Sequence, residues 1–268
     1  MQLPLLATIR QTFPRTRLDD IEIAVARQLT AAGTSQRMQR GSKVAITVGS
    51  RGIANLAVIV RAVVRWTQDH GGEPFIVPSM GSHAGATAKG QAAILDDFGV
   101  SENFCGCPIR SSMETEIIGQ SPQGFPVYCD RNALSADHLI LMNRVKPHTG
   151  IAGPFESGLM KMLLIGLGKT PGAAIFHRAM NEYSFEELVR AVASQVLAKT
   201  KTLVGLAIVE NAYDETALVE AVLPERILER EPELLGQAVS HGCIRINNAA
   251  ITKLAKLLPI GVPVEIKA

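Results

Sequence analysis

From residue 43 onward, the chain alternates between two hydrophobic patterns. Four short runs rich in β-branched and aliphatic residues are typical of buried strands: 43–49, 73–78, 135–143 and 202–210. Four longer stretches carry apolar residues at helical spacing: 53–72, 87–99, 157–168 and 184–200. This alternation predicts an α/β fold, with a mainly parallel, doubly wound sheet and flanking helices.

The alternating pattern ends near residue 236. Residues 223–235 (LPERILEREPELL) are highly charged and helical in pattern, and the composition changes after them. We therefore expect an α/β domain over residues 1–236 and a separate C-terminal segment over residues 237–268.

Composition narrows the class of protein. Hydrophobic residues make up 47% of the 268 residues and aromatic residues only 4%, which favours an α/β domain over a β-sandwich. The net charge of +2 gives no reason to expect nucleic acid or an anionic membrane as a partner. No apolar run is as long as a membrane span, and the N-terminus lacks the apolar core of a signal peptide. We therefore expect a cytoplasmic protein.

Polar and charged side chains follow three of the predicted strands. Arg51 follows the first strand, His83 follows the second, and Arg144, Lys146 and His148 follow the third. In open α/β sheets, ligands bind beyond the carboxyl ends of the strands. Histidines and arginines gathered at one sheet edge predict a site for an anionic substrate with proton-transfer chemistry.

Three segments at these loops make the prediction more specific. They read TVGSRGI, VPSMGSHAGATAKG and NRVKPHTGIAGPFESGLMKMLLIGLGK, and their combination resembles the N-terminal domain of the nickel-dependent lactate racemase family. The resemblance covers residues 1–236. It implies a racemase or epimerase that acts on a small 2-hydroxy acid by reversible hydride transfer. It also implies a nickel pincer nucleotide, derived from nicotinic acid adenine dinucleotide, as the cofactor.

The resemblance assigns roles to five residues. His83 and His148 match the acid–base pair of the family, and Arg51 matches the residue that binds the substrate carboxylate. Lys161 matches the lysine that tethers the cofactor, and His177 matches the histidine that ligates nickel.

These roles suit the side-chain chemistry. Imidazole titrates near neutral pH, a guanidinium binds a carboxylate through two hydrogen bonds, and an imidazole nitrogen is a good nickel ligand. Lys161 follows a glycine-containing loop at a helix start, where free backbone N–H groups would suit a phosphate. The alternative is that Lys161 only extends from an apolar helix to solvent.

Two features differ from the family pattern. The chain reads SGLMK where the family's lactate racemases read SGGRK, which leaves the identity of the hydroxy acid open. Those racemases also have a second domain of comparable size, whereas the pattern here stops near residue 236. A site open on one side predicts a partner chain or a homo-oligomer that covers it.

The C-terminal segment resembles a different family. The run SHGCIRINN and the residues after it look like the C-terminal end of an L,D-transpeptidase (YkuD) catalytic domain. By this resemblance Cys243 would be the nucleophile, and Ser240, His241 and Arg245 would line its pocket. The family supplies a histidine base upstream of the cysteine, but residues 224–239 contain no histidine. This difference favours a short foreign tail over an active transpeptidase.

Three hypotheses follow from the sequence. The favoured one is a lactate racemase-like isomerase that uses a nickel pincer nucleotide. The runner-up is an L,D-transpeptidase that cross-links peptidoglycan through Cys243. The third is a non-catalytic α/β domain that binds a small anion.

Overall fold

The computed structural model describes residues 13–148, 150–237, 252–253 and 256, and its centre is a five-stranded sheet. The strands lie in the order β2 (Glu73–Pro78), β1 (Lys43–Val48), β5 (His138–Arg144), β6 (Thr202–Glu210) and β7 (Thr216–Val222). The first four are parallel, and β7 pairs with β6 in an antiparallel hairpin. The prediction of an α/β fold with a mainly parallel sheet is therefore confirmed.

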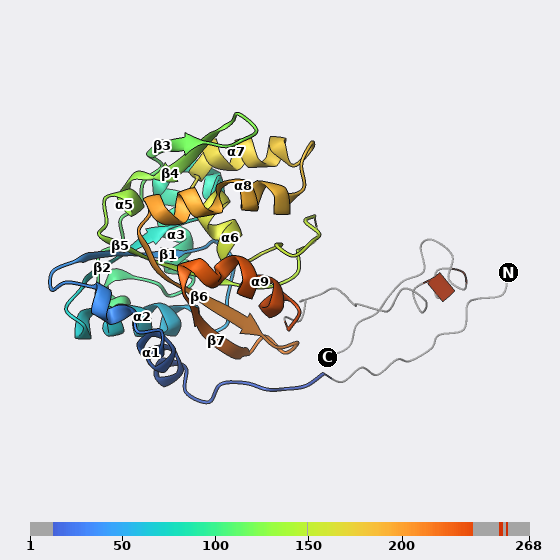
Figure 1. The fold of residues 1–268 in the computed structure, drawn as a ribbon. Coiled ribbons are helices and arrows are strands. Elements are labelled where there is room, and N and C mark those ends of the chain that lie inside the picture. Colours follow the sequence, from blue (N-terminus) through green and yellow to red (C-terminus); the bar gives the residue numbers. More distant parts are fainter. Residues whose placement is uncertain (1–12, 149, 238–251, 254–255, 257–268) are drawn as a thin grey trace.

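Helices cover both faces of this sheet (Figure 1). One face carries α1 (Ile21–Ala31), α2 (Leu56–Asp69), α3 (Ala88–Asp97) and α4 (Glu102–Cys105). The other carries α5 (Arg131–Leu134), α6 (Leu159–Lys161), α7 (Lys169–Ala179), α8 (Phe185–Lys199) and α9 (Ile227–Leu235). In Figure 1, α1 and α2 lie below the sheet, and α7 and α8 lie above it.

The two helical layers bury two separate cores because successive side chains of a strand point to opposite faces. In β1, Val44 and Ile46 belong to the core beneath α1 and α2. Ala45, between them, belongs to the core beneath α6, α7 and α8. The near-continuous apolar strands predicted from the sequence are thus explained by burial on both sides.

Local sequence signals set several helix ends. Thr87 caps α3 by accepting a hydrogen bond from the Gly90 N–H, at the position predicted for the start of this helix. Ser184 and Glu187 form a reciprocal capping box at the start of α8. The helical pattern of residues 223–235 becomes a short 3₁₀ turn (Pro224–Arg226) followed by α9.

Three of the observed strands were not predicted from the sequence. β3 (Thr115–Gln120) and β4 (Pro126–Asp130) form a separate antiparallel hairpin, and β7 extends the main sheet. β3 and β7 do not alternate cleanly between buried and exposed positions, and β4 has only five residues. The predicted strands are near-continuous apolar runs, and none of these three segments has a comparably long run, so they were not predicted.

Residues 157–179 do not form one continuous helix. α6 has only three residues and passes into a π-helical turn (Met162–Gly166). The chain then bends by 112° into α7. Gly166 packs closely on the loop after β2, because a Cβ at this position would lie 2.7 Å from the Ser79 carbonyl oxygen. Within the described residues, no single helix is long and apolar enough to span a membrane, and only this bent pair reaches that length when its halves are added together.

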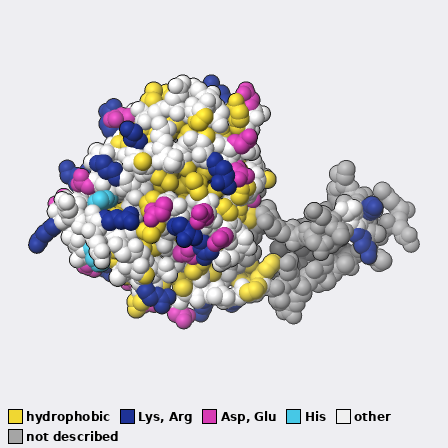
Figure 2. Space-filling view, in the orientation of Figure 1, with side chains coloured by type: hydrophobic (Ala, Val, Ile, Leu, Met, Phe, Trp, Pro, Cys, Tyr) yellow, Lys and Arg dark blue, Asp and Glu magenta, His cyan; other side chains and the backbone are white. Residues whose placement is uncertain are grey.

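Charges of both signs are mixed on the surface. On the face that Figure 2 shows, acidic and basic side chains are interspersed among the described residues. Arg230 of α9, for example, pairs with both Glu220 and Glu233. This arrangement agrees with the small net charge of the chain.

Candidate functional site

The strand order brings the three predicted loops together. β2, β1 and β5 are neighbours in the sheet and run parallel, so their carboxyl ends share one edge. His83 follows β2, Arg51 follows β1 and His148 follows β5. The chain order also reverses between β1 and β5, which is the point of an open α/β sheet where ligands bind.

His83 is exposed in the loop after β2 and is held from one side of its ring. The Ser50 hydroxyl, in the loop after β1, forms a short hydrogen bond with the His83 Nδ1. This leaves Nε2 of the ring available to a ligand. Partial burial lowers the pKa of His83, and the nearby charges of Arg51, Lys161 and His177 lower it further.

His148 is half-buried and has a defined protonation pattern. Its Nδ1 accepts a hydrogen bond from the Gly150 N–H at 3.0 Å, so the ring is neutral and carries its proton on Nε2. The backbone N–H of His148 donates to the Glu156 carboxylate, which fixes the loop. Burial is the main cause that lowers the pKa of His148. The nearby charges lower it further, in the decreasing order Lys161, Lys146, Arg51 and His177.

Lys161 is the last residue of α6 and is half-buried. Burial is the main cause that lowers the pKa of its amine to about 8, and the positive charges of Arg51 and Lys146 add to it. More of this amine is therefore neutral near pH 7 than in an ordinary exposed lysine, although most of it stays protonated. Lys161 is thus not a fully exposed side chain, and its role as the cofactor lysine stays a prediction.

His177 lies on the exposed side of α7, in its last turn. Its charge lowers the pKa of both His83 and His148, so it lies close to these two residues. The structure thus brings together all five residues that the family resemblance singled out. Among the residues that the structure describes, no group of three His, Cys, Asp or Glu side chains is arranged to hold a metal ion.

Arg144 was predicted to join this cluster, but its side chain has a different partner. Its guanidinium is nearly buried and pairs with the Glu210 carboxylate at the end of β6. The same carboxylate accepts a hydrogen bond of 2.6 Å from the Ala54 N–H, in the loop that also carries Arg51. Arg144 therefore stabilises the edge of the site, and Arg51 is the arginine that faces it.

The expected phosphate-binding N–H groups before Lys161 are already occupied. The Glu231 carboxylate on α9 accepts a hydrogen bond of 2.9 Å from the Met160 N–H and another from the Leu159 N–H. A phosphate cannot bind these amides while the carboxylate is in place. The prediction of a phosphate site at the start of this helix is therefore wrong.

A buried ion pair supports the loop that carries His83. The Lys169 amine is fully buried and lies 3.2 Å from the Asp130 carboxylate and 3.1 Å from the Gln91 side-chain oxygen. It also donates to the Pro78 carbonyl, while the Gln91 amide donates to the Gly81 carbonyl at 3.0 Å. Both carbonyls lie just before His83, so the pair fixes the path of the chain toward it.

The sequence analysis missed several residues of the site. Ser50 contacts His83, Glu156 holds the His148 backbone, and Glu231 caps the helix of Lys161. Serine and glutamate are common in loops and on helix surfaces, so residue type alone gives no signal for these roles. Only the adjacency of Ser50 to Arg51 placed it near the predicted site.

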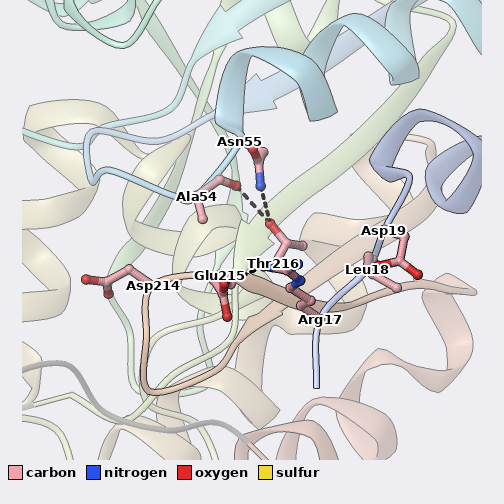
Figure 3. Close-up of a pocket in the computed structure, with 8 residues that line it drawn as sticks. All are labelled: Arg17, Leu18, Asp19, Ala54, Asn55, Asp214, Glu215 and Thr216. Atoms are coloured by element: carbon pink, nitrogen blue, oxygen red, sulfur yellow. Dashed lines mark hydrogen bonds and ion pairs between the residues drawn. The ribbon is translucent and has the colours of Figure 1, made fainter. Parts of the chain in front are cut away.

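A separate pocket of about 450 Å³ lies beside Ala54 and Asn55 (Figure 3). It lies between the residues Ala54 and Asn55, the turn before β7, and the segment from Arg17 to Asp19. The Thr216 hydroxyl links its walls by donating to the Ala54 carbonyl at 3.1 Å and accepting from Asn55 at 3.0 Å. None of the predicted site residues lines this pocket.

The residues of the transpeptidase hypothesis lie outside the described part of the chain. These are Ser240, His241, Cys243 and Arg245. The domain boundary predicted at residue 236 also stays a prediction. Residues 227–235, however, pack against α6 and β6 as part of the α/β core.

Comparisons with known proteins support two resemblances. Residues 8–187, more than half of the chain, match the family of the lactate racemase N-terminal domain, and residues 223–266 match that of the L,D-transpeptidase catalytic domain. No curated protein matches the chain.

Among solved structures, the fold is similar to that of the lactate racemase apoprotein from Thermoanaerobacterium thermosaccharolyticum, with a TM-score of 0.61 and 17% sequence identity. That match covers 81% of this chain and 55% of the racemase, so the chain spans about half the length of that protein. The second match begins at residue 223, and α9 therefore lies within it even though this helix packs on the α/β core.

Proposed function

The chain belongs to the lactate racemase N-terminal domain family, and we propose that it acts as a racemase or epimerase on a small 2-hydroxy acid. The observation that supports this proposal is the clustering of two histidines, an arginine and a half-buried lysine at one sheet edge. The charges of Arg51 and Lys161 lower the pKa of both His83 and His148, so these four side chains share one small region.

The residues present fit the cofactor of the family. Lys161 offers an amine with a pKa of about 8, and His177 offers an exposed imidazole close to both site histidines. We propose that these two side chains hold a nickel pincer nucleotide, Lys161 through its amine and His177 through a ring nitrogen. When bound, this cofactor supplies an acceptor for the hydride from the substrate α-carbon.

The two histidines are suited to move the hydroxyl proton of the substrate. Their lowered pKa values keep both rings neutral near pH 7, so either can act as a base. His83 can accept the proton at Nε2 when its Nδ1–H donates to Ser50. His148 holds a proton at Nε2 that it can donate to a substrate oxygen, and release of the Gly150 bond frees its ring to change tautomer.

Arg51 is suited to bind the substrate carboxylate. It is exposed at the end of β1, between the loops of His83 and His148. A guanidinium stays charged at all physiological pH values and binds a carboxylate through two parallel hydrogen bonds. In this position it would hold a 2-hydroxy acid with its hydroxyl group between the two histidines.

Racemisation assays with single enantiomers test the proposal. The full chain, produced in a host that makes the cofactor, should racemise at least one member of a panel of 2-hydroxy acids. His83→Ala and His148→Ala should each abolish this activity, whereas His138→Ala in β5 serves as a matched control. Normal activity in either site variant would contradict the acid–base assignment.

We also propose that a partner chain or a second copy of this chain covers the site. Arg51, His83 and His177 are exposed, and the chain spans about half of the racemase that it matches. Light scattering coupled to size-exclusion chromatography tests the second copy. A monomer at the concentration of a successful assay would rule out the homo-oligomer.

A second candidate function is favoured by the match of residues 223–266 to the L,D-transpeptidase family. Acylation of Cys243 by a carbapenem, measured by mass spectrometry with Cys243→Ser as control, would support it. An unmodified thiol would count against it, because the reaction requires a thiolate activated by a base.

A further inference from the structure

Glu231 is a buried carboxylate that faces the helix of Lys161. It lies on α9, is only 2% exposed, and forms no ion pair within the described part of the chain. Instead it accepts hydrogen bonds from the N–H groups of Leu159 and Met160, the first two residues of α6. A carboxylate at this position interacts favourably with the unpaired amides of a helix start.

Gly158 permits this contact. A Cβ at this position would lie 2.5 Å from one Glu231 carboxylate oxygen, a distance that side chains do not tolerate. The Gly158 carbonyl also accepts a hydrogen bond of 2.7 Å from the Asn143 side chain, at the end of β5. The glycine therefore fixes α6 between the sheet and α9, with space for the carboxylate and little else.

α6 cannot cap itself. It has three residues, its N-cap residue is Gly158, and that residue has no side chain to bond the free amides. α6 continues directly into the π-helical turn Met162–Gly166, so these free amides lie at the start of the helical segment Leu159–Gly166. Glu231 thus supplies from another element the cap that the local sequence lacks, two residues before Lys161.

Apolar packing holds α9 in place for this role. Ile227 and Leu234 are fully buried on either side of Glu231. At Gly205 in β6, a Cβ would lie 2.7 Å from the Leu159 side chain and 3.1 Å from that of Ile227. α6, α9 and β6 therefore meet at close range, and a movement of α9 would be transmitted to α6.

We propose that Glu231 is a positioning residue for Lys161, because its carboxylate caps α6 and keeps the lysine amine half-buried beside Arg51 and Lys146. This inference rests on the proposed function only in treating Lys161 as the functional amine. Glu231 lies outside residues 8–187 and inside the segment that matches the transpeptidase family. A segment beyond the matched racemase pattern therefore contributes to the lysine site.

The pKa of Lys161 in the cofactor-free full chain tests this role directly. Trace acetylation with acetic anhydride across a pH series, quantified on the Lys161 peptide by mass spectrometry, gives the midpoint of its titration. In the unmodified chain this midpoint should lie near pH 8. Glu231→Ala should move it upward by at least one pH unit, because an uncapped α6 lets water reach the amine.

Two further variants separate positioning from a general loss of stability. Glu231→Gln keeps an oxygen acceptor for the α6 amides and should retain the midpoint near pH 8. Glu233→Ala removes an exposed carboxylate from the same helix and should change nothing. If Glu231→Ala does not fold, Gly158→Ala supplies the same test by displacing the carboxylate.

Either of two results would overturn the proposal: an unchanged midpoint in folded Glu231→Ala, or an equal shift in Glu231→Gln. The readout concerns only the amine and the cap. A chain that binds no cofactor and racemises no substrate would refute the proposed function, yet its Lys161 midpoint would still decide the role of Glu231.

Discussion

Partial burial, and then the positive charges around them, lower the pKa of both site histidines and keep their rings neutral. Arg51, Lys161 and His177 all act on His83, and the same three charges with Lys146 act on His148. Such a setting favours an anionic ligand and a neutral imidazole base at the same time. Ser50 orients the His83 ring, because its hydroxyl binds Nδ1 and leaves Nε2 available to a ligand.

Replacing Arg51 by Gln should raise the pKa of three groups. Arg51 is a cause of the lowered pKa of His83, His148 and Lys161, so removing its charge makes their protonated forms less costly. Two-dimensional NMR titration of the histidine ring signals measures the first two. Arg65→Gln on α2, which pairs with Glu22, is the matched control. Unchanged histidine titrations in Arg51→Gln would contradict the shared site.

At the scale of elements, two buried carboxylates fix the positions of site segments. Asp130 at the end of β4 holds Lys169 at the start of α7, and Glu231 of α9 holds α6. Neither contact is close in sequence. Each contact joins a segment near Lys161 to an element that is distant in the sequence. Tertiary contacts therefore fix the positions of α6 and α7.

Lys169→Met should destabilise the fold by roughly 3 kcal/mol or more, because it leaves Asp130 buried without its cation. Both groups of this pair are fully buried. Urea unfolding at pH 7 measures the change. The double variant with Asp130→Asn should recover part of the loss, since the amide oxygen still accepts from the Ala133 N–H. A single variant with wild-type stability would refute the importance of the pair.

Glu231 should make stability depend on pH. Burial raises the pKa of its carboxyl from 4.5 to about 7, so the folded state holds the proton more tightly than the unfolded state. Its contribution is therefore fully present below pH 4.5 and is lost as the pH rises through 7. The free energy of unfolding of Glu231→Gln should therefore rise relative to that of the parent, by up to about 3 kcal/mol, as the pH increases from 4.5 to 8.

Urea unfolding of both proteins at these two pH values measures the difference. Glu233→Gln, on the exposed side of α9, is the control. A parent and a Glu231→Gln variant with parallel pH profiles would show that the carboxyl has an ordinary pKa in the folded state.

At the scale of the whole molecule, the sequence predicted the features that depend on local patterns. The α/β architecture, the buried parallel strands and the loop positions of His83, Arg51 and His148 all follow from strand ends and periodicity. It could not predict that the Arg144 guanidinium pairs with Glu210 and that the Glu231 carboxylate lies on α6. Charged residues in a helical pattern such as 223–235 look like a solvent-exposed surface until packing shows which one is buried.

The match to the transpeptidase family begins at residue 223, inside the described α/β core. The α/β core includes α9, although this helix lies in the segment that matches the transpeptidase family. The racemase-like cluster lies on the sheet edge, with three of its five side chains exposed. We therefore propose that Lys161 and His177 lie where they can hold the nickel pincer nucleotide.

Mass spectrometry of the Lys161 peptide, after production in a host that makes the nickel pincer nucleotide, tests that claim most directly. We predict a covalent adduct on Lys161, with nickel in matching amount. We also predict that the adduct is absent in Lys161→Met and that nickel alone is reduced in His177→Ala. An unmodified Lys161, in a host where a full-length lactate racemase acquires its adduct, would refute the role of Lys161 as the cofactor lysine.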